Sequence, residues 1–112
     1  MPNSAPQLDR LFRALSDPTR RAVLERLSGG DAPMTTLARP FRMALPSFAQ
    51  HLDLLEECGL VRSDKRGRVR IYRLVPQPLR TAETWMSKRR ADWERRLDQL
   101  DTHLNELKER TR

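Results

Sequence analysis

The chain has 112 residues, of which 38% are hydrophobic and 5% aromatic, so it suffices for one domain with a modest core. Its formal net charge of +7 at pH 7 favours a polyanionic partner, either nucleic acid or an anionic membrane surface. We expect a cytoplasmic protein that does not enter a membrane, because no apolar run approaches the roughly 20 residues of a span, no secretory signal opens the sequence, and a lone Cys58 cannot form an internal disulfide.

Two helices are expected after a short N-terminal arm. Residues 1–6 are small, polar and interrupted by proline, so we expect a flexible arm ahead of a single domain over residues 7–112. A first helix should end near Ser16, because large apolar residues recur before it at helical spacing. These residues are Leu8, Leu11, Phe12 and Leu15. Asp17 as N-cap and Pro18 as first helical residue then begin a second helix.

The stretch from Leu45 to Cys58 is the helix on which the predicted function depends. Pro46 suits the first helical position, and Gly59 suits the left-handed residue just past the end. The apolar side of this helix carries Phe48, Leu52 and Leu55, and its polar side carries Gln50, Asp53 and Glu57. A third helix, capped by Thr35 or Thr36 and expected to be kinked or brief because of Pro40, precedes it closely enough for a helix-turn-helix. An ordinary amphipathic surface helix would have the same stripe.

A basic β-hairpin is predicted after this helix. The segments 61–65 and 68–74 alternate and are rich in β-branched residues, with Arg66-Gly67 between them. Residues 62–80 include seven basic side chains and one acidic side chain. Such charges protect an exposed sheet edge from aggregation, but their position beside a helix-turn-helix favours contact with nucleic-acid phosphates.

A long C-terminal helix is predicted over residues 78–109. Its apolar residues are Leu79, Ala82, Met86, Trp93, Leu97, Leu100, Leu104 and Leu107, and the last five form a heptad seam. Thirty helical residues reach about 45 Å, which a small core cannot cover. The first part of the helix should pack on its own domain, and the rest needs a partner helix, most simply that of a second copy. Trp85 and Trp93 are expected as packing anchors rather than as a ligand cage.

Four segments together resemble a known family. ALSDPTRRAVLERL, TTLARPF, LPSFAQHLDLLEECGLV and RSDKRGRVRIYRL look like the arsenic-repressor-like (ArsR/SmtB) family of small bacterial winged-helix repressors, over a match from about Leu8 to Leu107. The resemblance implies a mainly α, α+β winged helix-turn-helix fold with about five helices, a two-stranded β-hairpin wing and a long C-terminal dimerisation helix. It implies a homodimeric repressor that reads a palindromic DNA operator with the helix 45–58 and contacts the backbone with the wing 62–74.

The functional residues follow from this match by position. The expected DNA-binding residues are Thr35, Thr36, Arg42, Ser47, Ala49, Gln50, His51, Lys65, Arg66, Arg68 and Arg70. The expected dimer interface comprises Leu8, Leu11, Phe12, Trp85, Trp93, Leu97, Leu100, Leu104 and Leu107. The sequence departs from the family in two ways: Ala49 stands where many members have a serine, and the third helix lacks the cysteine pair that binds soft metals in many members.

Other functional classes are disfavoured by the residues present. An enzyme is not expected. The sequence has only two histidines and one thiol, and it contains neither a phosphate-binding glycine loop nor a group of residues arranged to activate a nucleophile. His51 suits a packed, hydrogen-bonded position, and Cys58 a small buried one, with a redox switch as the alternative. Asp101, His103 and Glu106 imitate the zinc ligands of metal-sensing relatives, but they share one histidine, so no metal or other cofactor is expected.

The effector and the sequence preference each have alternatives. The effector is expected to be an organic molecule, a partner protein, or absent. The main rival to a repressor is a basic architectural protein that binds nucleic acid without sequence preference, which would lack the affinity ratio of roughly 10³ or more that a specific repressor has.

Overall fold

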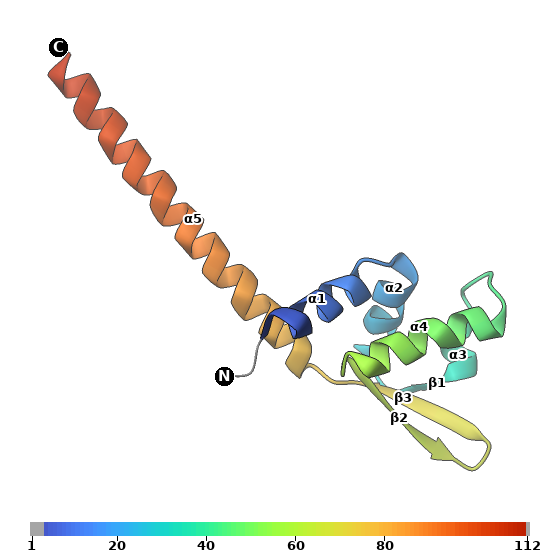
Figure 1. Ribbon diagram of the computed structural model, residues 1–112. Coiled ribbons are helices and arrows are strands. Elements are labelled where there is room, and N and C mark those ends of the chain that lie inside the picture. The colour runs from blue at the N-terminus through green and yellow to red at the C-terminus, as the bar shows by residue number, and fades with distance from the viewer. Residues whose placement is uncertain (1–3, 112) are drawn as a thin grey trace. The chain divides into compact units, whose positions relative to one another are not determined.

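The computed structural model describes residues 4–111 and is drawn in Figure 1. Its elements are α1 (Ser4–Leu15), α2 (Pro18–Leu27), β1 (Ala32–Pro33), α3 (Met34–Ala38), α4 (Leu45–Glu57), β2 (Val61–Arg66), β3 (Val69–Leu74) and α5 (Gln77–Arg110). The five helices and the hairpin confirm the predicted α+β winged helix-turn-helix. No helix in the described residues is long and apolar enough to cross a membrane.

The stretch expected to be one domain divides into two compact units. The first extends to Ala82 and contains α1 to α4, the sheet and the start of α5, and the second begins at Glu83 and is the remainder of α5. The helix α1 begins at Ser4, so residues 4–6, expected in a flexible arm, belong to a helix instead. Residues 1–3 of the expected arm lie outside the described part of the chain.

The helix α2 begins as its sequence predicts. Asp17 is the N-cap, its carboxylate accepts a hydrogen bond from the backbone N–H of Arg20 at 3.0 Å, and Pro18 follows as the first helical residue. Burial opposes the ionisation of Asp17, but the backbone bond from Arg20 and the nearby His51 and Arg20 outweigh it. The pKa of this carboxyl is therefore below its ordinary value.

The helix α3 differs from its prediction at its start and agrees with it at its end. It begins at Met34 with Pro33 in the N-cap position, so Thr35 and Thr36 lie inside the helix and do not cap it. It ends at Ala38, before Pro40, so the proline follows a one-turn helix rather than kinking a longer one.

The sheet has three antiparallel strands in the order β1-β3-β2, one more than predicted. In the hairpin, Val61 pairs with Leu74 and Arg66 with Val69, which leaves Gly67 and Arg68 as the loop. Gly67 has a φ of 65°, in the left-handed region that tight hairpin loops require. The added strand β1 pairs with residues 71 and 72 on the other side of β3.

The core of the first unit is built around α4. The predicted stripe of Phe48, Leu52 and Leu55 is fully buried. It packs with residues of α1, α2, α3 and both hairpin strands, among them Val23, Leu37, Leu60, Val61 and Tyr72. The rings of Phe41 and Phe48 stack with centroids 5.4 Å apart, which joins the α3–α4 connection to this core.

The second unit is a single helical stretch with an exposed apolar seam. The side chains of Trp85, Met86, Trp93, Leu97, Leu100, Leu104 and Leu107 are 41–58% exposed. The guanidinium of Arg89 lies 5.5 Å from the Trp85 ring, and that of Arg96 lies 5.7 Å from the Trp93 ring. Local ion pairs such as Arg90–Glu94 occupy its polar sides.

Candidate nucleic-acid interface

The first two turns of α4 present an uncharged polar surface. Ser47 and Gln50 are exposed, and Ala49 is partly exposed beside them. Among the described residues, no side chain caps the start of α4, and its first turn holds no acidic residue. The end of the same helix is acidic, since Asp53, Glu56 and Glu57 are all exposed. A polyanion therefore meets the start of α4 with less repulsion than its end.

The tip of the hairpin carries cations that have no internal partner. The side chains of Lys65, Arg66 and Arg68 are exposed, and the part of the chain that the structure describes gives none of these side chains a hydrogen bond or ion pair. These three residues are named the cationic tip. Their charges need no bond to be broken before they contact a phosphate.

Arg70 differs from the cationic tip. Its Nη1 donates to the Ser63 hydroxyl oxygen at 3.0 Å, and that hydroxyl donates to the Glu56 carboxylate. The sequence predicts the same role for Arg66, Arg68 and Arg70, because this chain of bonds leaves no local pattern in the sequence. Arg70 therefore begins from a partly satisfied state within the hairpin.

The candidate residues before α4 lie at the surface with different exposure. Thr35 and Arg42 are exposed, and Thr36 is partly exposed. They belong to α3 and to the connection that the Phe41–Phe48 stack joins to α4. The helix-turn-helix layout thus places them on the chain segment that precedes the start of α4.

His51 is less exposed than Ser47 and Gln50, the other polar candidate residues in α4. Its Nδ1 lies 3.1 Å from Nη1 of Arg20 and 3.7 Å from a carboxylate oxygen of Asp17. Its side chain is 24% exposed. This agrees with the expected packed histidine, although sequence reasoning missed Arg20 as its partner. The only signal for Arg20 was its place in the capped first turn of α2.

The expected interface residues of α1 differ in how deeply they are buried. Leu11 is 3% exposed and belongs to the core of the first unit, so its assignment to a dimer interface is corrected. Leu8 and Phe12 are partly buried against the same core and retain some exposed surface. Helical spacing identified the apolar side of α1 but could not separate the part that this chain covers itself.

Comparison with known proteins places this geometry in a family. A helix-turn-helix domain model matches residues 15–64. The transcriptional repressor SdpR of Bacillus subtilis is 33% identical over 79 residues, which cover 70% of this chain and 88% of SdpR. The regulator Rv2034 of Mycobacterium tuberculosis is 40% identical over 76 residues, which cover 68% of this chain and 71% of Rv2034. The solved structure of the ArsR family regulator RHA00566 is 47% identical, with a TM-score of 0.80 over 84% of this chain and 97% of that one.

The chain belongs to the ArsR family of winged helix-turn-helix transcriptional regulators. A second solved structure, an ArsR-like regulator from Rhodococcus sp. RHA1, is 34% identical with a TM-score of 0.74, over 87% of this chain and 92% of that one. As an ArsR-family regulator the protein binds DNA, and its family is not one of enzymes.

The single thiol of this ArsR-family regulator is a packed group. The Sγ of Cys58 donates to the carbonyl oxygen of Arg10 at 3.4 Å. Burial and the nearby Glu57 raise the pKa of the Cys58 thiol above its ordinary value. A raised pKa lowers the thiolate fraction, which is the reactive form. These contacts support the interpretation of Cys58 as a small packed residue.

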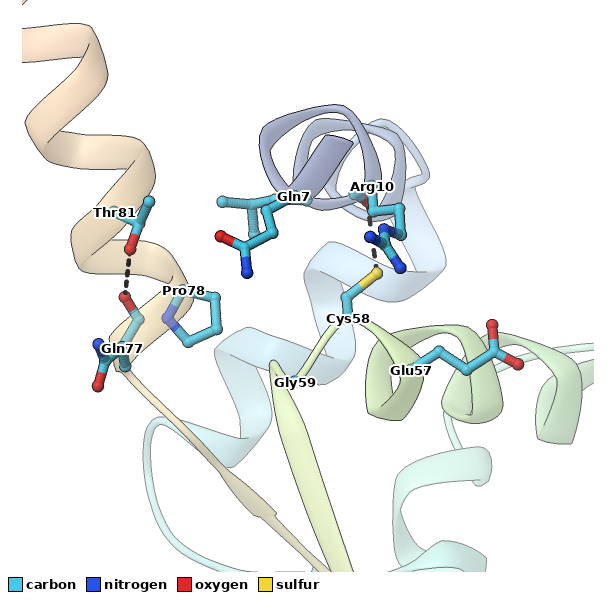
Figure 2. A pocket seen from close by; sticks show the side chains of 9 residues that line it. Gln7, Arg10, Glu57, Cys58, Gly59, Gln77, Pro78 and Thr81 are labelled. Carbon is cyan, nitrogen blue, oxygen red and sulfur yellow. Dashed lines mark hydrogen bonds between the residues drawn. The ribbon is translucent and has the colours of Figure 1, made fainter. Parts of the chain in front are cut away.

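A cavity of about 320 Å³ adjoins this thiol within the first unit (Figure 2). It is lined by residues of α1, of the end of α4 and of the first turn of α5, including Gln7, Arg10, Glu57, Cys58 and Pro78. Its lining mixes a cation, a carboxylate, an amide and apolar groups, so it does not select one ligand charge. Within residues 4–111 no three His, Cys, Asp or Glu side chains are grouped as metal ligands.

Proposed function

We propose that this ArsR-family regulator is a homodimeric repressor that reads a palindromic operator with α4 and contacts the DNA backbone with its hairpin. The observation that carries the proposal is the pairing, in one compact unit, of an uncharged polar helix start with a cationic tip. The naming of the relative SdpR as a repressor supports the direction of regulation. Such a protein acts in the cytoplasm, where its DNA lies.

Base reading is assigned to the start of α4. Gln50 is exposed, and its amide suits bidentate pairing with adenine in the major groove, while Ser47 is able to bond with several bases. Ala49 offers only a methyl contact, and this suits a thymine methyl group. The acidic end of α4 favours insertion of the helix by its first two turns, as in other helix-turn-helix proteins.

Backbone contact is assigned to residues on both sides of α4. The cationic tip supplies free charges for phosphates, and Thr35 and Arg42 supply exposed donors before α4. The uncapped start of α4 adds backbone N–H groups, which bind phosphate readily at a helix N-terminus. These contacts give affinity and register rather than sequence preference.

Dimerisation is assigned to the seam of α5. Exposed apolar side chains at Trp93, Leu97, Leu100, Leu104 and Leu107 follow the 4, 3, 4, 3 spacing of a heptad repeat. An exposed seam of this length is a site for a partner helix, and a second copy supplies an identical one. Two linked reading helices match a palindromic site with half-sites about one helical turn apart.

Regulation is proposed to be independent of metal. The two possible metal-binding pairs, Asp101 with His103 and His103 with Glu106, would use the same histidine. All three side chains are exposed on α5, where charged side chains are ordinarily solvated. Any effector is therefore expected to be an organic molecule or a partner protein.

The proposal is tested by selecting bound fragments from the organism's own DNA with the full-length protein. Enrichment of a palindrome, followed by titration on the intact and the scrambled sequence over a range of salt, should give an affinity ratio of roughly 10³ or more. A ratio near one at every salt concentration would instead identify a basic architectural protein.

A further inference from the structure

Arg20 joins three elements of the DNA-binding unit through one side chain. From the first turn of α2, its Nε donates to the carbonyl oxygen of Ala14 at 2.8 Å and its Nη2 to that of Arg13 at 2.9 Å. Its Nη1 lies 3.1 Å from Nδ1 of His51 on α4. Carbonyl groups in the last turn of a helix lack intrahelical donors. The guanidinium therefore links the end of α1 to the middle of α4.

The contact with Arg20 determines where the proton of His51 lies. A guanidinium has donors only and stays charged in proteins, so Nδ1 must accept. The proton of the neutral imidazole is then on Nε2. The carboxylate of Asp17 lies 3.7 Å from the same Nδ1, but a carboxylate has no proton to donate, so it cannot replace Arg20 as the partner of an unprotonated Nδ1.

The other ring nitrogen of His51, Nε2, keeps some accessible surface. Among the described residues it has no hydrogen-bond partner, and no buried side-chain nitrogen or oxygen of the described chain lacks one. Nε2 is therefore not buried, and in this tautomer it is a donor. His51 follows Gln50 directly and lies one turn after Ser47, the two residues proposed to read bases.

We propose that Arg20 is a positioning residue for DNA binding, which holds α4 against the end of α1 and fixes His51 in the Nε2-protonated tautomer as a donor for a phosphate oxygen. The proposal rests on the proposed function for α4 as the reading helix. It adds a residue outside the DNA contact set, because Arg20 acts through His51.

Arg21 is a matched control on the same helix. Its Nη1 donates to the carbonyl oxygen of Leu15 at 2.7 Å, so it also bonds to the end of α1, but among the described residues no hydrogen bond or ion pair joins its side chain to α4. Replacement of either arginine by glutamine removes one positive charge and the bonds to α1, which are two for Arg20 and one for Arg21. Only Arg20→Gln also removes the bond to His51, and the tautomer of His51 reports that bond directly.

The first measurement is the ¹⁵N NMR spectrum of the imidazole nitrogens in the full-length protein without DNA, at alkaline pH where histidine is neutral. His103→Gln removes the signals of the only other histidine. In the wild type, Nδ1 of His51 should resonate as an unprotonated nitrogen and Nε2 as a protonated one. Arg20→Gln should mix the two tautomers, and Arg21→Gln should leave them unchanged. A wild-type ring protonated on Nδ1 would overturn the proposal.

The second measurement is affinity for the selected operator at a temperature where both variants are folded. Arg20→Gln should bind roughly tenfold more weakly than Arg21→Gln, the effect of losing a hydrogen bond to a charged group. On scrambled DNA Arg20→Gln should also bind more weakly than Arg21→Gln, because a phosphate contact does not depend on the base sequence. Equal operator affinities would refute the positioning role.

A second pair of variants and the NMR spectrum keep the proposal testable if the first pair fails. If Arg20→Gln does not fold, Arg20→Lys retains the charge but lacks the planar fork, and it should still lose affinity relative to Arg21→Lys. A wild type with no operator preference would refute the proposed function itself. The NMR spectrum would still decide whether the Arg20–His51 bond exists, so the two failures are distinguishable.

Discussion

The hydroxyl of Ser63 on β2 donates to the carboxylate of Glu56 on α4, with oxygen–oxygen distances of 3.0 and 3.2 Å. The same hydroxyl accepts a hydrogen bond from Arg70 on β3. The reading helix and both strands of the hairpin are therefore joined by one serine. This relationship divides the basic residues of the hairpin into a free group at the tip and one that is already bonded.

Substitution of the hairpin arginines should separate these two groups. Arg66→Ala and Arg68→Ala should each weaken binding to all DNA sequences and lower the slope of log affinity against log salt by about one. Arg70→Ala should lower the slope by less, because its guanidinium is partly engaged with Ser63. Salt titrations on one duplex measure all three. Equal slopes for the three variants would contradict the distinction.

Gln50→Ala should reduce sequence preference rather than general affinity. Loss of a bidentate contact to a base should cost about 1–3 kcal/mol on the operator and little on random DNA. Competition binding with both duplexes gives the two costs. Asp53→Asn is a control on the acidic part of the same helix and should leave the preference intact. If Gln50→Ala weakened both duplexes equally, it would have no base-reading role.

Leu100→Glu should dissociate the proposed dimer. A carboxylate in the middle of a desolvated seam would cost several kcal/mol without a partner charge. Sedimentation should then give monomers, and operator affinity should collapse because each half-site is bound separately. Thr102→Glu places the same charge on another side of α5 and should remain dimeric. An unchanged dimer in Leu100→Glu would exclude the α5 seam as the interface.

Asp17→Ala should destabilise the protein in a pH-dependent way. Loss of the N-cap should cost about 1 kcal/mol at neutral pH. Because the folded-state pKa of Asp17 lies below its ordinary value of 3.8, its contribution is present above that value and is lost as the pH falls through the lowered pKa. Denaturant unfolding of both proteins from neutral to acidic pH should therefore converge. A difference that is constant down to pH about 2 would contradict the linkage.

Zinc should not alter operator binding. The expected result is the same operator affinity with and without zinc, titrated under competition from a chelator, for the wild type and for His103→Ala. A lone histidine with two carboxylates on one helix lacks a ligand for a closed tetrahedral site. Sub-micromolar zinc affinity that releases DNA and is lost in His103→Ala would overturn the metal-independent proposal.

Local patterns predicted the core of α4 but not every partner of it. The burial of Phe48, Leu52 and Leu55 follows from helical periodicity, which is contained in a few consecutive residues. The same periodicity placed Leu11 on an apolar side of α1 without revealing that its own chain covers it. Periodicity predicts which side of a helix is buried, but the covering surface depends on distant segments.

The features that the sequence did not predict are held by non-local contacts. The strand β1 has two residues and exists through its pairing with Tyr72 and Ile71, about forty positions away. Arg20 reaches His51 across 31 positions, and Arg70 reaches Ser63 across a hairpin. A short strand or a single polar contact has no period of its own to detect. The DNA contact set rests on the family resemblance, and its residues remain predictions.

The three-stranded sheet makes one part of the wing harder to bend than another. In the middle of β3, hydrogen bonds form on both sides, since Ile71 and Tyr72 pair with β1 as well as with β2. From Arg70 toward the loop, β2 is the one strand that pairs with β3 among the described residues. Bending the middle would break two ladders, whereas bending the tip strains one. We therefore expect the cationic tip to bend more readily than the middle of β3 and to follow variation in groove width while residues 71 and 72 stay in place.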